Sequence, residues 1–339
     1  MKPVTIADVA LHAKVSKSTV SQFLNKRYDY MGEKTKQRIE QAIKDLGYQP
    51  NYVARSLKQK STKTIGVIVA NILHNFSTEV SRAIEDACNE HGFHLIVCNA
   101  DDNPEKEKKY MEMLRAKQVD GIIIFPTGGN KELYQKMLDE KYPVVFVDRE
   151  VQGIPVSSIM LENKKAARLA VEHFIERGYK RIGIMTTSII RNLSPRVERI
   201  EGYKEAMNDN GLPVQKEYMK SLDLEQIQDG MKSMLSLKEP PEAVVAGNDL
   251  ALIEILKYVK QNRLKIPEDL AVIGIDDVSF ASFYTPSITT VAQPTFEMGK
   301  KAADVLLTKI SKKQGKDNLP DYRFEPQLMV RDSVGYRNG

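Results

Sequence analysis

From Thr64 onward, continuous apolar segments alternate with amphipathic ones, and this alternation limits the fold more than any other feature. A run such as Ile65-Gly66-Val67-Ile68-Val69-Ala70 has no polar side, so a strand there must be covered on both faces. Apolar strands separated by helices form parallel sheets covered by helices. The expected strands are 65–70, 93–99, 121–125, 143–148, 181–185, 243–246 and 271–276, with helices at about 77–91, 104–117 and 163–177. So many strands predict an α/β body of two doubly wound parallel-sheet subdomains over residues 64–339.

The charge is divided unevenly between this body and the residues that precede it. Residues 1–63 hold 13 Lys and Arg against 5 Asp and Glu, whereas the rest of the chain holds 37 against 40. All the excess positive charge of this +5 chain therefore lies in its first fifth. Such asymmetry indicates a small polyanion-binding module, although a basic segment can also serve only solubility.

The first residues predict two short helices joined by an abrupt turn, followed by a third helix. Thr5 can cap a helix Ile6–Ala13, Lys14-Val15 forms the turn, and Ser16 can cap a second helix that ends at Leu24. A third amphipathic helix is expected over Glu33–Leu46. This pattern predicts a three-helix head with a helix-turn-helix over residues 1–49.

The second of these helices divides into an inner and an outer face. Val20, Phe23 and Leu24 face inward, and the outward residues are Lys17, Ser18, Ser21 and Gln22. A helix-turn-helix needs this division, because the buried face fixes the helix while its exposed N-terminal end enters the major groove.

Three segments of the chain resemble one family closely. They are Thr5-Ile6-Ala7-Asp8-Val9-Ala10, then Val15-Ser16-Lys17-Ser18-Thr19-Val20-Ser21-Gln22-Phe23-Leu24-Asn25, and Gly47-Tyr48-Gln49-Pro50-Asn51-Tyr52-Val53-Ala54-Arg55-Ser56-Leu57. The segments are similar to the head of lactose/galactose-repressor (LacI/GalR) family regulators, and the similarity continues almost to the C-terminus. It implies a DNA-binding transcription regulator, most simply a repressor, with a periplasmic-binding-protein-like body whose chain crosses between the subdomains near 160–163 and 289–294.

Side-chain chemistry and the resemblance assign the same roles in the head. Lys17, Ser18 and Gln22 are expected to read base edges, since Lys can donate to guanine, Gln can pair with adenine, and Ser is adaptable. The residues expected to contact phosphates, which fix register without specifying sequence, are Thr19, Ser21, Asn25, Lys26, Arg27 and Tyr28, and Thr5 completes the set.

Residues 50–63 are expected to form a hinge helix and a linker. Pro50 blocks continuation of the preceding helix, and Asn51 can cap a short new one. So short a helix needs a partner, which its twin on DNA could supply. The resemblance implies that Leu57 wedges into the minor groove, although a capping contact onto the body is an alternative. The predicted DNA-binding residues of the hinge are Asn51, Ala54, Arg55, Leu57 and Lys58.

A ligand cleft is expected beside the carboxyl ends of the parallel strands, where open α/β sheets bind ligands. Polar residues that follow those ends are therefore candidates, and the resemblance implies an effector-binding role for Arg199, Asn248 and Asp276. Leu224 falls where relatives place an aromatic platform. The predicted effector-binding residues are His74, Phe76, Thr127, Asp148, Arg149, Arg191, Arg199, Leu224, Asn248 and Asp276.

Arginines near the cleft favour an anionic ligand, because a guanidinium pairs with carboxylate or phosphate through two hydrogen bonds. Arg149, Arg191 and His74 are departures from the family pattern that point the same way. A keto sugar acid is the first choice, such as a ketodeoxygluconate-like compound from uronate breakdown, with a phosphosugar second and a neutral sugar third. Each arginine is equally suited to bridging a neighbouring acid.

Other classes of function lack sequence support. The chain has no P-loop, zinc-spaced His pair, G-x-S-x-G elbow or dinucleotide-binding glycines, so we expect no enzyme, no cofactor and no metal. Cys88 and Cys98 are expected to be buried thiols. No apolar run of about 18 residues and no secretory signal is found, which predicts a cytoplasmic protein without a membrane partner.

The sequence thus predicts a homodimer that binds a pseudo-palindromic operator and whose DNA affinity depends on a small effector. The main alternative is a solute-binding protein for transport, which the basic head disfavours. A regulator that responds to a partner protein is the second alternative.

Overall fold

The computed structural model describes residues 4–29, 31–49, 61–188, 193–311 and 321–337, in two compact units, Met1–Thr62 and Lys63–Gly339. The proposed hinge residues Asn51, Ala54, Arg55, Leu57 and Lys58 lie outside the described residues, as does the predicted effector contact Arg191.

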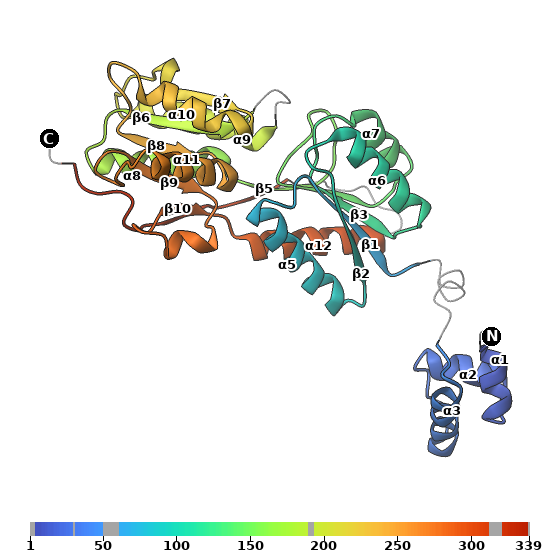
Figure 1. The fold of residues 1–339 in the computed structure, drawn as a ribbon. Helices are drawn as coiled ribbons and strands as arrows, with labels where there is room; N and C mark the ends of the chain where they lie inside the picture. Colours follow the sequence, from blue (N-terminus) through green and yellow to red (C-terminus); the bar gives the residue numbers. More distant parts are fainter. Residues whose placement is uncertain (1–3, 30, 50–60, 189–192, 312–320, 338–339) are drawn as a thin grey trace. The chain divides into compact units, whose positions relative to one another are not determined.

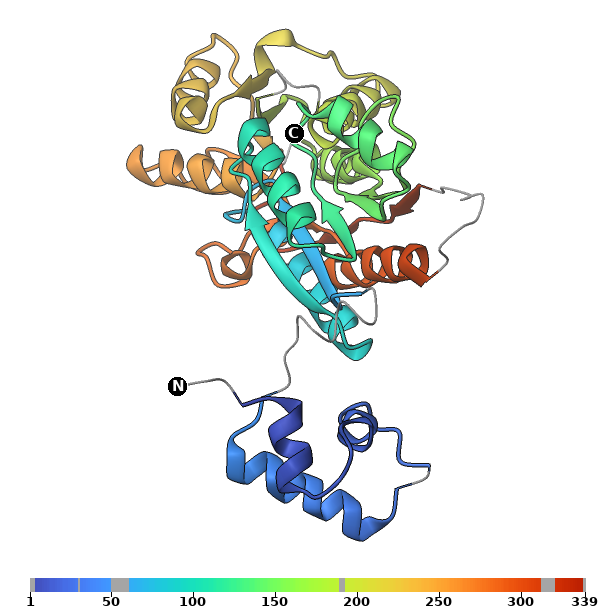
Figure 2. The same cartoon turned by 90° about the vertical axis from the view of Figure 1, so that its right-hand side faces the viewer.

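The head is a bundle of three helices, α1 (Ile6–His12), α2 (Lys17–Leu24) and α3 (Glu33–Leu46), which pack against one another (Figure 2). The Asp8 carboxylate accepts the Thr5 backbone N–H at 2.8 Å, and the Ser16 hydroxyl oxygen accepts the Thr19 N–H at 3.1 Å. These caps start α1 and α2 as expected. Gly47 ends α3 at φ 59°, a left-handed conformation that glycine adopts without a steric cost. One side chain from each helix is fully buried at the centre: Val9, Val20 and Ile39.

The first subdomain of the body is a six-stranded sheet with the order β11-β5-β4-β3-β1-β2, in which every neighbouring pair is parallel. Its strands are β1 (Thr64–Val69), β2 (His94–Asn99), β3 (Gly121–Ile124), β4 (Val144–Val147), β5 (Ser158–Leu161) and β11 (Tyr322–Phe324). Its helices are α5 (Asn75–Glu90), α6 (Pro104–Ala116), α7 (Lys131–Asp139) and α12 (Thr295–Ser311). The helix α12 lies beside α5, although the two are far apart in the sequence (Figure 1).

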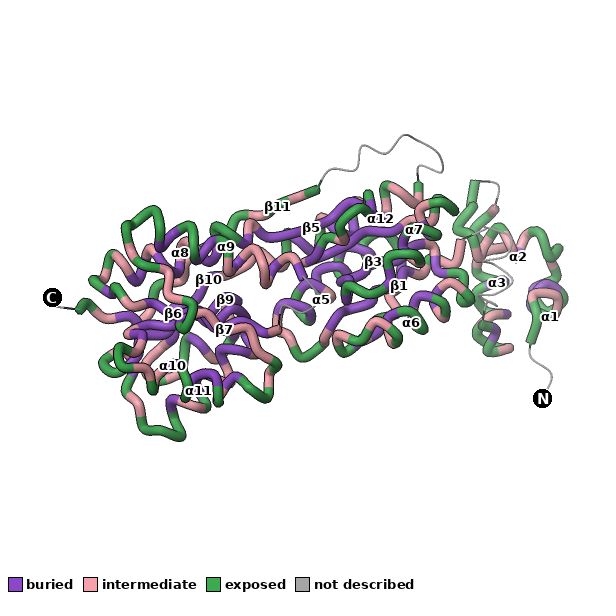
Figure 3. The backbone as a smooth tube through the Cα atoms, turned by 90° about the horizontal axis from the view of Figure 1, so that it is seen from above, coloured by how far each residue is buried: buried purple, intermediate pink, exposed green. Residues whose placement is uncertain are grey.

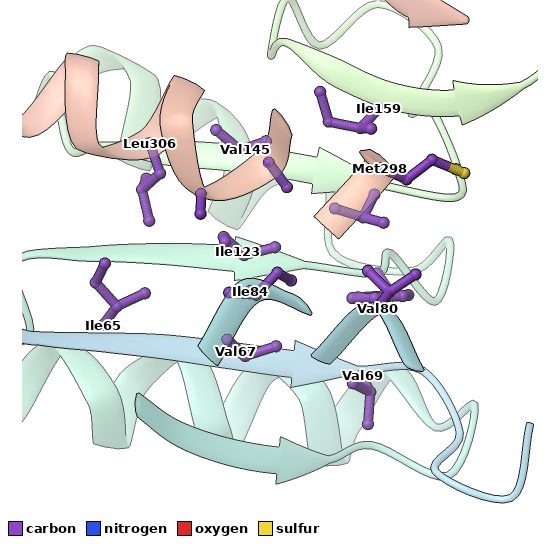
Figure 4. Close-up of a cluster of buried hydrophobic side chains, with 14 of the residues drawn as sticks. Ile65, Val67, Val69, Val80, Ile84, Ile123, Val145, Ile159, Met298 and Leu306 are labelled. Carbon is purple, nitrogen blue, oxygen red and sulfur yellow. The ribbon is translucent and has the colours of Figure 1, made fainter. Parts of the chain in front are cut away.

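Side chains alternate between the two faces of this sheet, as strand geometry requires. On one face, the strands pack against α5 and α12 (Figure 4) through Ile65, Val67, Val69, Ile123, Val145, Ile159, Val80, Ile84, Met298 and Leu306. On the other face, Ile68, Ile122 and Phe146 pack with Met111 of α6 and Tyr134 of α7. Both faces are therefore buried, which explains the continuous apolar runs.

The second subdomain repeats this arrangement with the order β12-β10-β9-β8-β6-β7, where only β12 is antiparallel to its neighbour. Its strands are β6 (Ile182–Thr187), β7 (Met219–Leu222), β8 (Ala243–Ala246), β9 (Ala271–Ile275), β10 (Thr289–Ala292) and β12 (Gln327–Met329). Its helices are α8 (Asn163–Glu176), α9 (Ser194–Asp209), α10 (Ile227–Leu235) and α11 (Asp249–Gln261). Figure 3 shows the interior strands of the body as buried between helices with exposed outer sides.

The chain passes between the two sheets three times. The passages lie between β5 and α8 at Glu162, between β10 and α12 at Gln293-Pro294, and between β11 and β12 at Glu325-Pro326. The last passage is additional to the two expected from the sequence, near 160–163 and 289–294. Three separate segments therefore join the subdomains of the body.

Candidate functional site

The outer side of α2 carries the residues that were expected to read bases. Lys17, Ser18 and Gln22 are exposed, whereas Val20 of the same helix is buried in the head. Ser18 and Gln22 are four residues apart, so they lie on one face of the helix. Their position leaves this face free to enter a groove of DNA.

The residues expected to contact phosphates surround that face and are mostly held by local contacts. The Thr19 hydroxyl oxygen lies 2.8 Å from the Ser16 hydroxyl oxygen, and the Asn25 side-chain amide donates to the Ser21 carbonyl oxygen at 2.7 Å. Lys26 is exposed and has a left-handed φ of 55°.

Tyr28 is held by two ring contacts. Its ring packs edge-on against Phe23, with 5.9 Å between the ring centroids. The Lys36 ammonium lies 4.7 Å from the centroid of the Tyr28 ring. The Thr5 side chain is engaged with Asp8 in the cap of α1. Both side chains are thus positioned by the head itself.

A cavity of about 480 Å³, including solvent at its open side, lies between the two subdomains of the body. Both sheets contribute to it from the carboxyl ends of their strands. It is lined by Ala70, His74, Phe76, Ser77, Phe125, Asp148, Arg149, Pro195, Arg196, Arg199, Asn248, Asp276 and Gln293. The structure therefore brings together seven of the ten predicted effector residues.

Two of the lining residues, Asp148 and Asp276, occupy equivalent places in the two sheets. Each follows the last residue of a strand, β4 or β9, and each donates its N–H to the neighbouring strand, at Ile159 and Val291 respectively. Their φ values are 69° and 86°, in the left-handed region that aspartate tolerates better than most residues. This backbone turn directs both residues to the cavity.

Arg199 is fixed in the cavity by the packing of α9. A Cβ atom at Gly202 would collide with the carbonyl oxygen of Lys164, so this glycine permits α9 to approach α8 closely. The buried Tyr203 hydroxyl then donates to the Ile182 carbonyl oxygen at 2.7 Å. The Arg199 guanidinium donates to Asn163 Oδ1 at 2.9 Å and to the Gly247 carbonyl oxygen at 2.6 Å.

Asp276 is buried, and both of its carboxylate oxygens accept hydrogen bonds. Its Oδ1 accepts the Gln293 side-chain amide at 2.5 Å, and its Oδ2 accepts the Asp249 N–H at 3.3 Å. Burial raises the pKa of Asp276, and the nearby Asp249 carboxylate adds to this effect while Arg199 opposes it. Asn248 caps α11 with its side-chain oxygen and donates its amide to the Thr187 hydroxyl at 3.0 Å.

Arg149 lines the cavity, but its guanidinium donates hydrogen bonds to groups of the protein. Its guanidinium donates to Asp148 at 3.1 Å, to Asp102 at 3.0 Å and to the Pro126 carbonyl oxygen at 3.0 Å. Burial alone would lower the pKa of Arg149, but the charges of Asp148 and Asp102 raise it. This arginine bridges neighbouring acids, the alternative that the sequence left open.

Two predicted effector residues do not line the cavity. Thr127 is fully buried, and its backbone N–H donates to the buried Glu107 carboxylate at 2.7 Å. Leu224 is half-buried and packs against the core formed by α10, α11 and β8 of the second subdomain. Thr127 belongs to a buried hydrogen-bond network around Glu107, and Leu224 belongs to the hydrophobic core of the second subdomain.

The sequence-based prediction missed several lining residues, of which Ser77, Arg196 and Gln293 are polar. Arg196 lies in the first turn of α9, three residues before the expected Arg199. Gln293 lies in a passage between the sheets. Its Oε1 is buried and has no hydrogen-bond partner among the described residues. Proximity to Arg199 and to the expected crossing were the signals that could have found them.

Two further features of the described residues bear on function. They contain no group of three or more His, Cys, Asp or Glu side chains placed to hold a metal ion. Within those same ranges, no helix has the length and apolar character needed to span a bilayer.

Comparison with known proteins assigns both units of the chain. Residues 5–51 match the bacterial regulatory proteins of the lacI family, and residues 62–322 match the periplasmic binding proteins and sugar binding domain of the LacI family. The chain therefore belongs to the LacI family and is a DNA-binding transcriptional regulator, as its sequence predicted.

Relatives cover nearly its whole length. The probable HTH-type transcriptional regulator EndR of Paenibacillus polymyxa is 50% identical over 333 residues, which is 97% of this chain and 98% of that protein. The HTH-type transcriptional regulator KdgR of Bacillus subtilis is 33% identical over 334 residues, 97% of each chain. The Lac repressor dimer bound to operator and the anti-inducer ONPF superposes with a TM-score of 0.84 at 25% identity, covering 98% of this chain and 100% of the other. These relatives are transcription regulators or repressors.

Proposed function

We propose that this chain is a repressor of a carbohydrate or sugar-acid catabolic operon and that an anionic sugar bound between the body subdomains controls its operator affinity. A keto sugar acid remains the first choice of effector, a phosphosugar the second and a neutral sugar the third. The single observation that carries the proposal is the cavity at the carboxyl ends of both sheets, where Arg199, Asn248 and Asp276 meet.

The charge of the cavity supports an anionic ligand. Its lining contains three arginines against two aspartates, Asp148 and Asp276. A carboxylate or phosphate group would compensate the remaining positive charge.

The DNA-binding and effector-binding roles are assigned to separate units of the chain. We propose a head at residues 1–49, a hinge helix and linker at 50–63 and a body at 64–339. Lys17, Ser18 and Gln22 read bases, and Leu57 of the hinge opens the minor groove. Such a regulator acts on genomic DNA, and we place it in the cytoplasm.

A homodimer would present two heads to a pseudo-palindromic operator. The edge of the first sheet offers a surface for the second copy. Ile72, Leu73 and Val97 have exposed fractions of 43%, 71% and 45%, and the Ile72 N–H donates to the Asn99 side chain at the end of the edge strand β2. Apolar side chains grouped at the surface favour association.

Replacement of Arg199 by glutamine tests the effector site. We expect the Arg199→Gln variant to bind the DNA upstream of its own gene as the unchanged protein does, but to lose the response of that binding to sugar acids. Fluorescence anisotropy with labelled DNA, with and without each compound, measures both properties. A variant with an unchanged response would remove Arg199 from the effector site.

A further inference from the structure

Arg196 has a position in the cavity that differs from that of Arg149. It lies in the first turn of α9 in the second subdomain, and its side chain is 16% exposed. One terminal nitrogen donates to the Ser188 carbonyl oxygen at 2.6 Å. The other approaches Asp102 of the first subdomain only to 4.0 Å.

The Asp102 carboxylate is shared unequally between two guanidinium groups. Arg149 takes it at 3.0 Å, with a hydrogen bond, whereas Arg196 stays at 4.0 Å. Burial opposes ionisation of Asp102, but Arg149 and Arg196 hold the pKa of this carboxyl below its usual value, so it is a full anion. Arg149 therefore has two carboxylates within hydrogen-bond distance, Asp148 and Asp102, whereas Arg196 has none closer than 4.0 Å among the described residues.

The surroundings of Arg196 disfavour its own charge. Burial lowers the pKa of Arg196 to about 10, and the positive charge of Arg149 acts in the same direction. A guanidinium that is poorly compensated inside a cleft gains more from an incoming anion than one that already has close carboxylate partners.

The rest of the cavity is suited to hydroxyl groups. Arg196 and Arg199 are three residues apart and line the same cavity from one side of α9. The same lining contains Asn248, Asp276 and Gln293, and the Oε1 of Gln293 is a buried acceptor without a partner among the described residues. A carbohydrate with hydroxyls at one end and an anionic group at the other could bond to the amide and carboxylate groups through its hydroxyls and to an arginine through its anionic group.

We propose that Arg196 is the residue that makes this cavity select a carbohydrate bearing a carboxylate or phosphate, by pairing with that anionic group in place of its long approach to Asp102. This inference rests on the proposed function, since it concerns the effector of the same cavity. Arg149 acts as an internal brace for Asp102 and Asp148, and does not contact the anion.

Isothermal titration of the full chain with matched compounds tests this role. The probes are a uronate and a keto sugar acid for the carboxylate, a hexose 6-phosphate for the phosphate, and the neutral parent sugars. We expect the chain to bind at least one anionic compound more tightly than its neutral parent. Arg196→Gln should weaken the binding of that anionic compound about 10- to 100-fold, as expected for the loss of a charge-assisted pair. The affinity for the neutral parent sugar should stay unchanged. Arg196→Lys should fall between the two, because lysine keeps the charge but loses the planar fork.

A control variant and three contrary outcomes separate the role of Arg196 from the proposed effector class. Arg263→Gln removes an exposed arginine from the same subdomain and should change no affinity. Binding of operator DNA and the thermal midpoint show whether each variant is folded. Equal binding of the anionic compound by Arg196→Gln and the unchanged chain would overturn the role of Arg196 while leaving the effector site intact. A neutral sugar bound as tightly as its acid and its phosphate would overturn the anionic selectivity. Failure of every compound to bind would overturn the proposed effector class, and this inference with it.

Discussion

The imidazole Nδ1 of His74 lies 2.5 Å from Oδ1 of Asp249, and these two residues belong to different subdomains of the body. The other oxygen of the same carboxylate accepts the backbone N–H of Asn75 at 2.7 Å. The Asp249 side chain is only 2% exposed. One buried carboxylate thus connects the start of α5 to the start of α11 beside the effector cavity, so that closure of the subdomains is stabilised by the protein itself.

Removing the charge of Asp249 should weaken the folded body. We expect Asp249→Asn to lower the free energy of unfolding by about 2–4 kcal/mol, because an amide cannot accept from both donors and leaves His74 without its anion. Urea denaturation of the full chain, followed by circular dichroism since it contains no Trp, measures the change. Asp229→Asn is the matched control, because Asp229 also lies in the first turn of a helix of this subdomain but is exposed. Equal effects of the two substitutions would contradict the bridging role.

The same contact predicts a dependence on pH. Burial lowers the pKa of His74, but the hydrogen bond and charge of Asp249, helped by Asp276, outweigh burial and the opposing Arg149, so the pKa is raised above 6.5. A raised folded pKa means that the stabilisation is fully present below pH 6.5 and is lost as the pH rises through the folded value. Asp249 has a lowered pKa despite its burial, so it stays ionised above about pH 4.

The measurement compares the unchanged chain with His74→Gln, which keeps a neutral donor but cannot titrate. The difference in unfolding free energy should be larger at pH 6 than at pH 9, by about 1.4 kcal/mol for each unit of pKa shift. A difference that is constant across this range would show that the contact is an uncharged hydrogen bond.

The head should separate base recognition from phosphate binding. Gln22→Ala should relax the base preference at one operator position in each half-site, at a cost of about 1–3 kcal/mol in binding free energy. Lys26→Ala should weaken binding to all DNA sequences similarly and reduce the salt dependence of the affinity. Selection from randomised DNA, followed by affinities at several salt concentrations, measures both. Lys260→Ala removes one positive charge from an exposed site on the body and serves as the charge-matched control. If Lys26→Ala altered the preferred sequence, its assignment to the phosphates would be wrong.

The exposed edge of the first sheet should govern association. Leu73→Glu places a charge in the apolar group formed with Ile72 and Val97, so we expect dimers to dissociate at protein concentrations where the unchanged chain stays paired. Sedimentation equilibrium gives the dissociation constant directly. Leu11→Glu, at an exposed leucine of the head, is the control. An unaltered dimer would move the proposed interface elsewhere.

How much of the fold the sequence predicts depends on burial and on how apolar each strand is. Seven strands are predicted from their apolar runs, and β8 has the expected bounds, because both of its faces are covered. The interior strands β5 and β10 are buried but not predicted, because Ser158, Thr289 and Thr290 interrupt their apolar character. The edge strands β7, β11 and β12 are short and half-exposed, so no continuous apolar run marks them. Their pairing depends on neighbours that are distant in the sequence.

The cavity shows the same limit. Residues that directly follow strands, such as Asp148 and Asp276, could be named because strand ends converge at one edge of a sheet. Arg196 is separated from the end of β6 by a longer connection, so its place in the sequence does not mark it as a neighbour of a strand end. The His74–Asp249 contact joins positions 175 residues apart, a pairing that neither local pattern contains.

The three passages between the sheets have a mechanical consequence. A hinge made of one segment would allow swinging in any direction, whereas segments at Glu162, Gln293-Pro294 and Glu325-Pro326 must all turn together, which favours rotation about a single axis. A protease that cut one of them would leave the halves tethered by the other two, so nicked protein would still migrate as one particle in the absence of denaturant.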